Sequence, residues 1–345
     1  MSKRRLPNLR VGDLVEVRSA DEILGTLDEN GELENLPFMP EMLQYCGKRM
    51  RVHKVAHKLC DTISATGLHW MNSAVHLKDA RCDGMSHGGC QTGCLFYWKE
   101  SWLRRVTETG DSRVAPVTKP IAAERLSVLH RAARKPPGEE GEERFACQAT
   151  ELLRAAPTRI RFWHLWPYVA DVRAGNVGLA TAIKSILLGL FNAYQGRSKR
   201  YLPKWLQIKD GMPWGFVKGS NITTTPSLQL NLKPGDLVRI RPKEQIMQTL
   251  NGRRLNRGMG FEEQMARSCG RTARVDRRVE RCIHEKTGRM LTMKDSCIVL
   301  EGVICDGIYH GNCPREFIPF WREIWLEPLG TEQSVNTSKG PHETA

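Results

Sequence analysis

The sequence lacks the short motifs that mark the commonest nucleotide-binding and metalloprotease sites. It contains no G-x-x-x-x-G-K-[ST] phosphate loop, no G-x-G-x-x-G after an apolar strand and no H-E-x-x-H pair. It also lacks the C-x-x-C knuckle that is common in structural zinc sites. Cysteine and histidine are present in numbers, but no local motif selects a Cys-His nucleophile pair. Whether the protein is an enzyme therefore stays open at this level.

Long apolar runs and an apolar N-terminal segment are also missing. The longest apolar stretch, Leu179 to Tyr194, is interrupted by Lys184 and is too short to cross a bilayer. The first residues, Met-Ser-Lys-Arg-Arg, lead into polar sequence, so no signal peptide is visible. We expect a cytoplasmic protein that does not contact membranes. Since disulfides are rare in the cytosol, the 11 cysteines point to metal ligation, thiol chemistry or simple burial.

The chain repeats itself at an offset of 223 residues. Gly12-Asp-Leu-Val15 recurs as Gly235-Asp-Leu-Val238, and Cys82-Asp-Gly recurs as Cys305-Asp-Gly. The same offset matches the following pairs: His87 with His310, Cys90 with Cys313, Trp98 with Trp321, and Trp102 with Trp325. A repeat of this length indicates two copies of one structural unit.

The copies have the pattern of small β-rich modules, and the segment between them has the pattern of helices. Apolar and polar residues alternate in 13–18 and again in 49–55, as in half-buried strands. Apolar residues recur at three- and four-residue spacing from Val177 to Tyr194, which predicts a helix ended by Gly196. We predict an α+β protein in which two SH3-like modules flank a central helical segment. The expected parts are a first module at 8–106, a linker at 107–142, the helical segment at 143–230, a second module at 231–329 and a disordered tail at 330–345.

Cysteines recur within the repeat, which indicates a shared metal chemistry. Cys46, Cys60, Cys82 and Cys90 are matched with Cys269, Cys282, Cys305 and Cys313. Four cysteines suffice for a tetrahedral zinc site or an iron–sulfur cluster, and irregular spacing favours the cluster slightly. The alternative is that these are small buried residues. The candidate metal ligands are Cys46, Cys60, Cys82, Cys90, Cys94, Cys269, Cys282, Cys297, Cys305 and Cys313.

The two copies differ at two of these cysteines. Phe317 stands where Cys94 would recur, and Ala74 stands where Cys297 would recur. In one scheme Cys94 completes a site with Cys60, Cys82 and Cys90. The second copy then lacks a ligand, recruits Cys297 or Cys269, or keeps an open and more reactive position. In the other scheme Cys46 is the fourth ligand and both sites are closed.

The phrase Cys82-Asp-Gly-Met-Ser-His87 resembles the Cys-Asp-Gly-Ser-His signature of NEET-type iron–sulfur proteins, with one extra residue before the histidine and without the upstream C-x-C. Over nearly its full length the chain resembles an uncharacterised bacterial family of cysteine-rich two-repeat proteins found near biosynthetic genes. Three phrases carry this resemblance, at 36–42, at 82–90 and at 320–326. It implies no assigned reaction.

The net charge of +14 favours anionic partners such as nucleic acid or a phosphorylated ligand, although the positive residues are dispersed along the chain. Three functions remain. The first is a metal-binding accessory or redox protein, with iron–sulfur or zinc, that works with other proteins of a bacterial biosynthetic pathway. The second is an enzyme that uses a cysteine-ligated metal, and the third is a basic nucleic-acid-binding protein with structural zinc.

Overall fold

The structure is a computed structural model that describes residues 6–107, 123–161, 163–220 and 222–329. The predicted tail at 330–345 and residues 108–122 of the predicted linker lie outside the described residues. The chain is a mixed α+β protein with two compact units. Unit 1 contains residues 1–214 together with 281–292 and 305–318, and unit 2 contains 215–280, 293–304 and 319–345. Two segments of the second copy therefore belong to the unit built mainly from the first.

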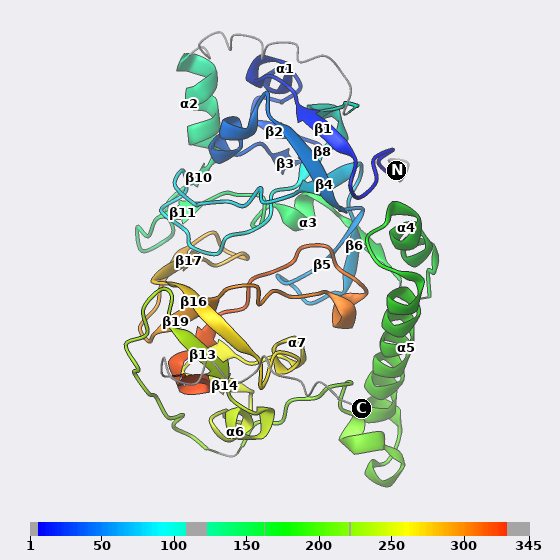
Figure 1. Cartoon of the computed structure of the whole chain (residues 1–345), viewed down its shortest axis with the longest axis vertical. Helices are drawn as coiled ribbons and strands as arrows, with labels where there is room; N and C mark the ends of the chain where they lie inside the picture. The colour runs from blue at the N-terminus through cyan, green and yellow to red at the C-terminus, as the bar shows by residue number, and fades with distance from the viewer. Residues whose placement is uncertain (1–5, 108–122, 162, 221, 330–345) are drawn as a thin grey trace, which may run out of the picture. The chain divides into compact units, whose positions relative to one another are not determined.

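Unit 1 contains a five-stranded antiparallel sheet with the strand order β8-β7-β4-β1-β9 (Figure 1). Its strands are β1 (Leu14–Val17), β4 (Arg49–Val55), β7 (Ala74–Leu77), β8 (Trp98–Lys99) and β9 (Leu103–Arg105). The alternating residues of β1 explain its place, because Val15 and Val17 are buried while Leu14 and Glu16 are partly exposed. Helix α1 (Ala20–Leu24) begins at a capping box formed by Ser19 and Glu22.

Unit 2 contains a five-stranded antiparallel sheet with the order β20-β19-β16-β13-β21. Its strands are β13 (Leu237–Ile240), β16 (Thr272–Arg278), β19 (Cys297–Leu300), β20 (Trp321–Arg322) and β21 (Leu326–Pro328). Each of these strands lies in the second copy where the matching strand of unit 1 lies in the first. Smaller elements of this unit are α6 (Lys243–Gln248), β14 (Leu255–Asn256), β15 (Met259–Gly260), α7 (Glu263–Ala266) and the 3-10 turn η6 (Glu323–Trp325).

The two sheets are also built alike in detail. The register shifts at the same place, between Val52 and Lys54 in β4 and between Val275 and Arg277 in β16. Each core holds two tryptophans with no exposed surface, in the order found in the sequence repeat: Trp98 and Trp102 in unit 1, Trp321 and Trp325 in unit 2. A phenylalanine packs edge-on against the second tryptophan of each pair, at 5.2 Å for Phe38 and 5.3 Å for Phe261.

Unit 1 also contains two cysteine-bearing hairpins. Strands β5 (Lys58–Cys60) and β6 (Leu68–Trp70) pair with each other, and β12 (Thr158–Ile160) extends them to three strands. Strands β17 (Arg281–Ile283) and β18 (Met290–Thr292) come from the second copy. Other elements of the unit are β2 (Glu32–Leu33), β3 (Leu36–Pro37), η1 (Pro40–Tyr45), η2 (Glu100–Trp102), α2 (Ala123–Ala132), β10 (Arg134–Lys135), β11 (Arg144–Phe145), α3 (Leu152–Ala155), η3 (Lys204–Leu206), η4 (Ile208–Gly211) and η5 (Ile308–His310).

The central segment supplies two helices that follow one another, α4 (Trp166–Ala174) and α5 (Leu179–Tyr201) (Figure 1). The predicted helix exists, but it does not end at Gly196. Its last turns are held because Gln195 is buried and donates to the carbonyl oxygens of Ile208 and Met212. Tertiary hydrogen bonds thus outweigh the low helix propensity of one glycine. Among the described residues, no helix has the length and apolar character needed to cross a membrane.

A buried ion pair fixes α4 to the hairpin β5–β6. Lys58 and Asp171 both have no exposed side-chain surface and contact each other directly. Asp171 also accepts a hydrogen bond from the side-chain amide of Asn176. The same amide accepts from the backbone N–H of Val55 at 2.7 Å and donates to its carbonyl oxygen at 2.8 Å. Two buried charges that satisfy each other in this way define where the helix packs.

Candidate metal centre

The loop between β7 and β8 brings its cysteines and histidine together by means of tight turns. The loop is closed at its base, where the amide of Cys82 donates to the carbonyl of Cys94 at 2.8 Å. Gly84 has φ +74°, and a Cβ there would lie 2.0 Å from the carbonyl oxygen of Cys90. Only glycine allows this close approach. The turn then carries His87 back over Gly84, to whose carbonyl its amide donates at 3.1 Å.

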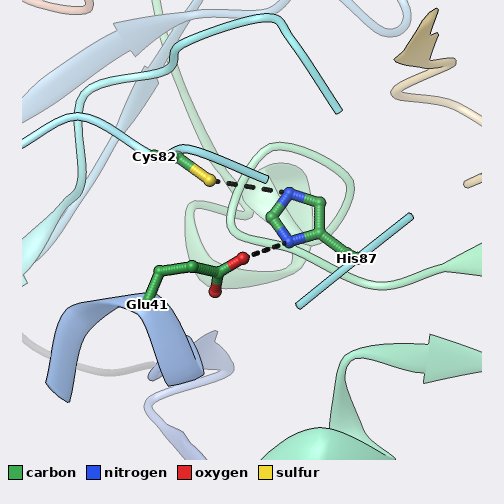
Figure 2. Close-up of side chains that lie close together, drawn as sticks. All are labelled: Glu41, Cys82 and His87. Atoms are coloured by element: carbon green, nitrogen blue, oxygen red, sulfur yellow. Dashed lines mark hydrogen bonds and ion pairs between the residues drawn. The ribbon is translucent and has the colours of Figure 1, made fainter. Parts of the chain in front are cut away.

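His87 lies between a thiol and a carboxylate (Figure 2). Its Nε2 is 3.5 Å from Sγ of Cys82, and its Nδ1 is 2.9 Å from Oε1 of Glu41, which lies in η1. Glu41 also accepts the amide of Ser86 at 2.9 Å. The side chains of His87 and Glu41 are 3% and 2% exposed. The ligand atoms of Glu41, Cys82 and His87 all lie within 4.8 Å of one another, a spacing that could hold a metal ion.

Cys90 lies at the other end of the loop and contributes to the raised pKa of His87. Its Sγ is 3.2 Å from Oγ1 of Thr92, with which it forms a hydrogen bond. The backbone amide of Ile283 in β17 also donates to Cys90. Amides directed at a sulfur stabilise the thiolate form, which is the form that binds metals.

The pKa values in the cluster indicate negative charge gathered around one imidazole. Burial alone would lower the pKa of His87, but hydrogen bonds to Cys82, Cys90 and Glu41 raise it far above its ordinary value. Burial would raise the pKa of Cys90, yet its hydrogen bonds to His87 and Thr92 lower it. The pKa of Cys82 stays raised, first because of burial.

Two further thiols lie beside this cluster. Burial raises the pKa of Cys147 to about 11, and the charges of His87, Cys82 and Cys90 also act on it. Burial likewise raises the pKa of Cys282 in β17 to about 11, and the next cause is the charge of Cys90. Cys282 packs beside Cys90, Phe145 and Ile283.

The matching loop of the second copy, also in unit 1, has the same backbone. The amide of Cys305 donates to the carbonyl of Phe317 at 2.8 Å, and that of His310 donates to Gly307 at 2.9 Å. Gly307 has φ +70°, and a Cβ there would lie 2.3 Å from the carbonyl oxygen of Cys313. These contacts reproduce those of Cys82, His87 and Gly84.

Cys60 pairs with this second loop. Its amide donates to Sγ of Cys313 at 3.1 Å. The Cys313 thiol and burial raise the pKa of Cys60 well above its ordinary value. For Cys313, burial is outweighed by the bond from Cys60 and by the positive charge of Arg315, so its pKa is lowered. At the offset of 223 residues the true match of Cys60 is Ile283, one residue after Cys282, and both amides donate to a loop cysteine.

The remaining candidate ligands lie elsewhere in their units. Cys46 ends η1 and packs against the core of unit 1, and burial raises its pKa to about 11. Cys94 lies at the base of the first loop, where burial raises its pKa well above the ordinary value. In unit 2, Cys269 packs against the core and Cys297 is fully buried in β19. Both schemes drawn from the sequence group Cys60 with Cys82 and Cys90. Among the described residues, the group of close ligand atoms contains Cys82 but not Cys60, whose amide donates to Cys313.

Sequence reasoning missed Glu41, His87 and Cys147 as members of the cluster. The signal for His87 was present, because the spacing C-x4-H-x2-C occurs in both copies. Glu41 gave no signal, since Gln264 stands at its place in the second copy. The first loop also has G-x-S-x-G spacing from Gly84 to Gly88, but it lies in a loop and not in the strand–turn–helix that makes a nucleophile elbow.

Comparison of the chain with protein-family models, with curated proteins and with solved structures finds no match. The geometry of the cluster therefore carries the functional argument.

Proposed function

We propose that this protein binds zinc through Cys82, His87 and Cys90, and that the metal has a structural role. The observation that carries this proposal is the position of His87, whose Nε2 faces Cys82 while Nδ1 meets the buried carboxylate of Glu41. Histidines that bind metals commonly donate their second ring nitrogen to a carboxylate, which fixes the tautomer and the ring. Glu41 is then the positioning residue, and Nε2 is the ligand atom.

The spacing of the ligand atoms fits a single tetrahedral ion. With zinc–sulfur and zinc–nitrogen bonds of about 2.3 and about 2.0–2.1 Å, two ligand atoms on one zinc lie roughly 3.5 Å apart. Nε2 of His87 and Sγ of Cys82 are 3.5 Å apart. Ligands on the two irons of a cluster would be further apart. We therefore favour zinc over the iron–sulfur cluster that the cysteine spacing suggested.

Cys282 is the best fourth ligand of this site. Its strand is docked on the first loop, because the amide of Gln91 donates to the carbonyl of Arg281 at 3.1 Å. Cys147 is the competing thiol, but Cys282 packs in one cluster with Cys90. A buried Cys3His site with four protein ligands is closed, and closed zinc sites stabilise folds. A closed site at the first loop favours the accessory-protein hypothesis over the enzyme hypothesis.

The proposed function goes with SH3-like modules, which the sheets support, and with a cytoplasmic location, which the reduced thiols support. The strand order of each sheet, with a 3-10 turn before the last strand, supports the SH3-like interpretation of both copies. None of the 11 cysteines, which all lie among the described residues, is in a disulfide, and the cytosol would keep such thiols reduced. Other proteins of a biosynthetic pathway remain the proposed partners.

Metal analysis of purified variants tests the proposal. The Cys82→Ser variant should lose one zinc ion per chain relative to wild type by plasma mass spectrometry. Cys46→Ser is the matched control, because Cys46 is also partly buried in unit 1 but packs against the core. Equal zinc in the Cys82→Ser variant and wild type would refute the site. Visible absorption at about 400 nm together with stoichiometric iron would show that the site holds an iron–sulfur cluster and not zinc. Comparing Cys282→Ser with Cys147→Ser identifies the fourth ligand.

A further inference from the structure

Cys60 of the hairpin β5–β6 and Cys313 of the second loop lie together in unit 1, where the amide of Cys60 donates to Sγ of Cys313. We propose that Cys305, His310 and Cys313 of the second copy bind a second zinc ion together with Cys60 of the first copy. These residues are distinct from those of the first site. The inference extends the zinc chemistry proposed above, but it stands on its own geometry.

The backbone of the second loop supports three of the four ligands. Its glycine turn, its base hydrogen bond and its histidine turn repeat those of the first loop, with donor–acceptor distances that agree within a few tenths of an ångström. The first loop uses this backbone to bring Cys82, His87 and Cys90 together. A repeated backbone also repeats the directions of the Cα–Cβ bonds, so Cys305, His310 and Cys313 start from the positions that Cys82, His87 and Cys90 hold in the first loop.

Cys60 supplies the fourth ligand from the hairpin β5–β6. Cys60 and His310 line one pocket of unit 1. The amide of Cys60 donates to Sγ of Cys313 at 3.1 Å, as amides do to metal-bound thiolates. The hairpin of the first copy thus serves the second loop, while β17 of the second copy contacts the first loop.

The second site differs from the first in access. His87 is 2% exposed and is held by Glu41, whereas His310 is exposed at the pocket. This pocket has a volume of about 780 Å³ and also contains Arg159, Arg161, Arg197 and Trp163. A metal bound there is reachable from solvent through the pocket. We therefore expect the second zinc to exchange faster than the first, and the arginines to favour anionic chelators.

Zinc stoichiometry and release kinetics of full-length variants test this proposal. Wild type should hold about two zinc ions per chain, and an anionic colorimetric chelator should remove them in a fast and a slow phase. Cys60→Ser and His310→Ala should each remove one zinc and the fast phase, and the double variant should lose no more than either alone. His310→Ala is the safer variant for folding, because His310 is exposed. His164→Ala, another exposed histidine of unit 1, is the control.

The two proposals fail separately. If Cys60→Ser and His310→Ala keep the zinc content and both release phases of wild type, the second site is refuted, whatever Cys82→Ser does. If Cys82→Ser keeps the wild-type content while Cys60→Ser loses one zinc, the first site is refuted and the second stands. A wild-type content of one zinc, lost entirely in Cys82→Ser, also overturns the second site.

Discussion

The backbone amide of Cys60 donates a hydrogen bond to Sγ of Cys313, which is 3.1 Å away and 253 residues further along the chain. This bond joins a strand of the first copy to a loop of the second within unit 1. Closing so long a loop costs conformational entropy. A metal ion shared by the two residues would offset this cost, because the unfolded chain has no such site and the binding free energy then adds to the folding free energy.

Replacing Glu41 should weaken the first zinc site without removing it. In the Glu41→Gln variant, an amide takes the place of the buried carboxylate that meets Nδ1 of His87 at 2.9 Å. Loss of such a partner typically lowers metal affinity by about 10–100-fold. Competition with a calibrated chelator measures the change. The exposed Glu139→Gln variant is the control, and an unchanged affinity in Glu41→Gln would show that Glu41 does not position the histidine.

The stability of unit 1 should fall with acid because of His76. This side chain is fully buried, and burial lowers its pKa to about 4, from 6.5 when unfolded. Its contribution is fully present above about pH 6.5. Below that value His76 binds a proton in the unfolded chain but stays neutral in the folded chain. The free energy of unfolding therefore falls between about pH 6.5 and about pH 4, by up to about 3 kcal/mol.

The variant His76→Gln isolates this effect. Urea unfolding of wild type and variant across this pH range should give a shallower pH dependence for the variant. Other titrating groups, including any metal ligands, contribute to both proteins and cancel in the difference. If the free energies of unfolding of wild type and variant vary in parallel with pH, the pKa of His76 is not lowered by folding.

The buried pair of Lys58 and Asp171 should be costly to break from one side only. Lys58→Met leaves the Asp171 carboxylate buried without its cation and should destabilise unit 1 by about 3–5 kcal/mol. Adding Asp171→Asn removes the uncompensated charge and should recover much of the loss. Denaturant unfolding measures both. A cost below about 1 kcal/mol for Lys58→Met would show that water reaches the pair.

The two tryptophan cores should respond equally to the same change. The Trp102 indole donates to Oγ1 of Thr26 at 3.0 Å, and that of Trp325 donates to Thr249 at 2.9 Å. Thr26→Val and Thr249→Val should each cost about 1–3 kcal/mol, because a buried N–H loses its acceptor. Thermal unfolding of both variants provides the comparison. A cost in one variant alone would mean that the two cores do not share one packing scheme.

The sequence allowed the strands of both copies to be predicted, because strand signals are local. The alternation at 49–55 corresponds to β4, and the matched Trp98 and Trp321 lie in the matched strands β8 and β20. The spatial grouping of segments could not be predicted. An offset between copies gives their order along the chain, but it does not show that β17, β18 and the loop at 305–318 belong to unit 1.

The candidate site was predictable only in part, for the same reason. Cys82 and Cys90 share one loop, so their proximity follows from glycine turns. The pairing of Cys60 with Cys313 depends on tertiary packing, and the role of Glu41 depends on one hydrogen bond between η1 and the loop. Neither leaves a local pattern in the sequence.

X-ray absorption at the zinc edge tests the central claim most directly. Wild-type protein should contain zinc with about three sulfur ligands at about 2.3 Å and one imidazole nitrogen at about 2.0–2.1 Å. The His87→Ala variant should contain one zinc ion per chain fewer than wild type. Zinc bound only by oxygen and nitrogen, or a wild-type protein without zinc after purification under reducing conditions and zinc supply, would contradict the account.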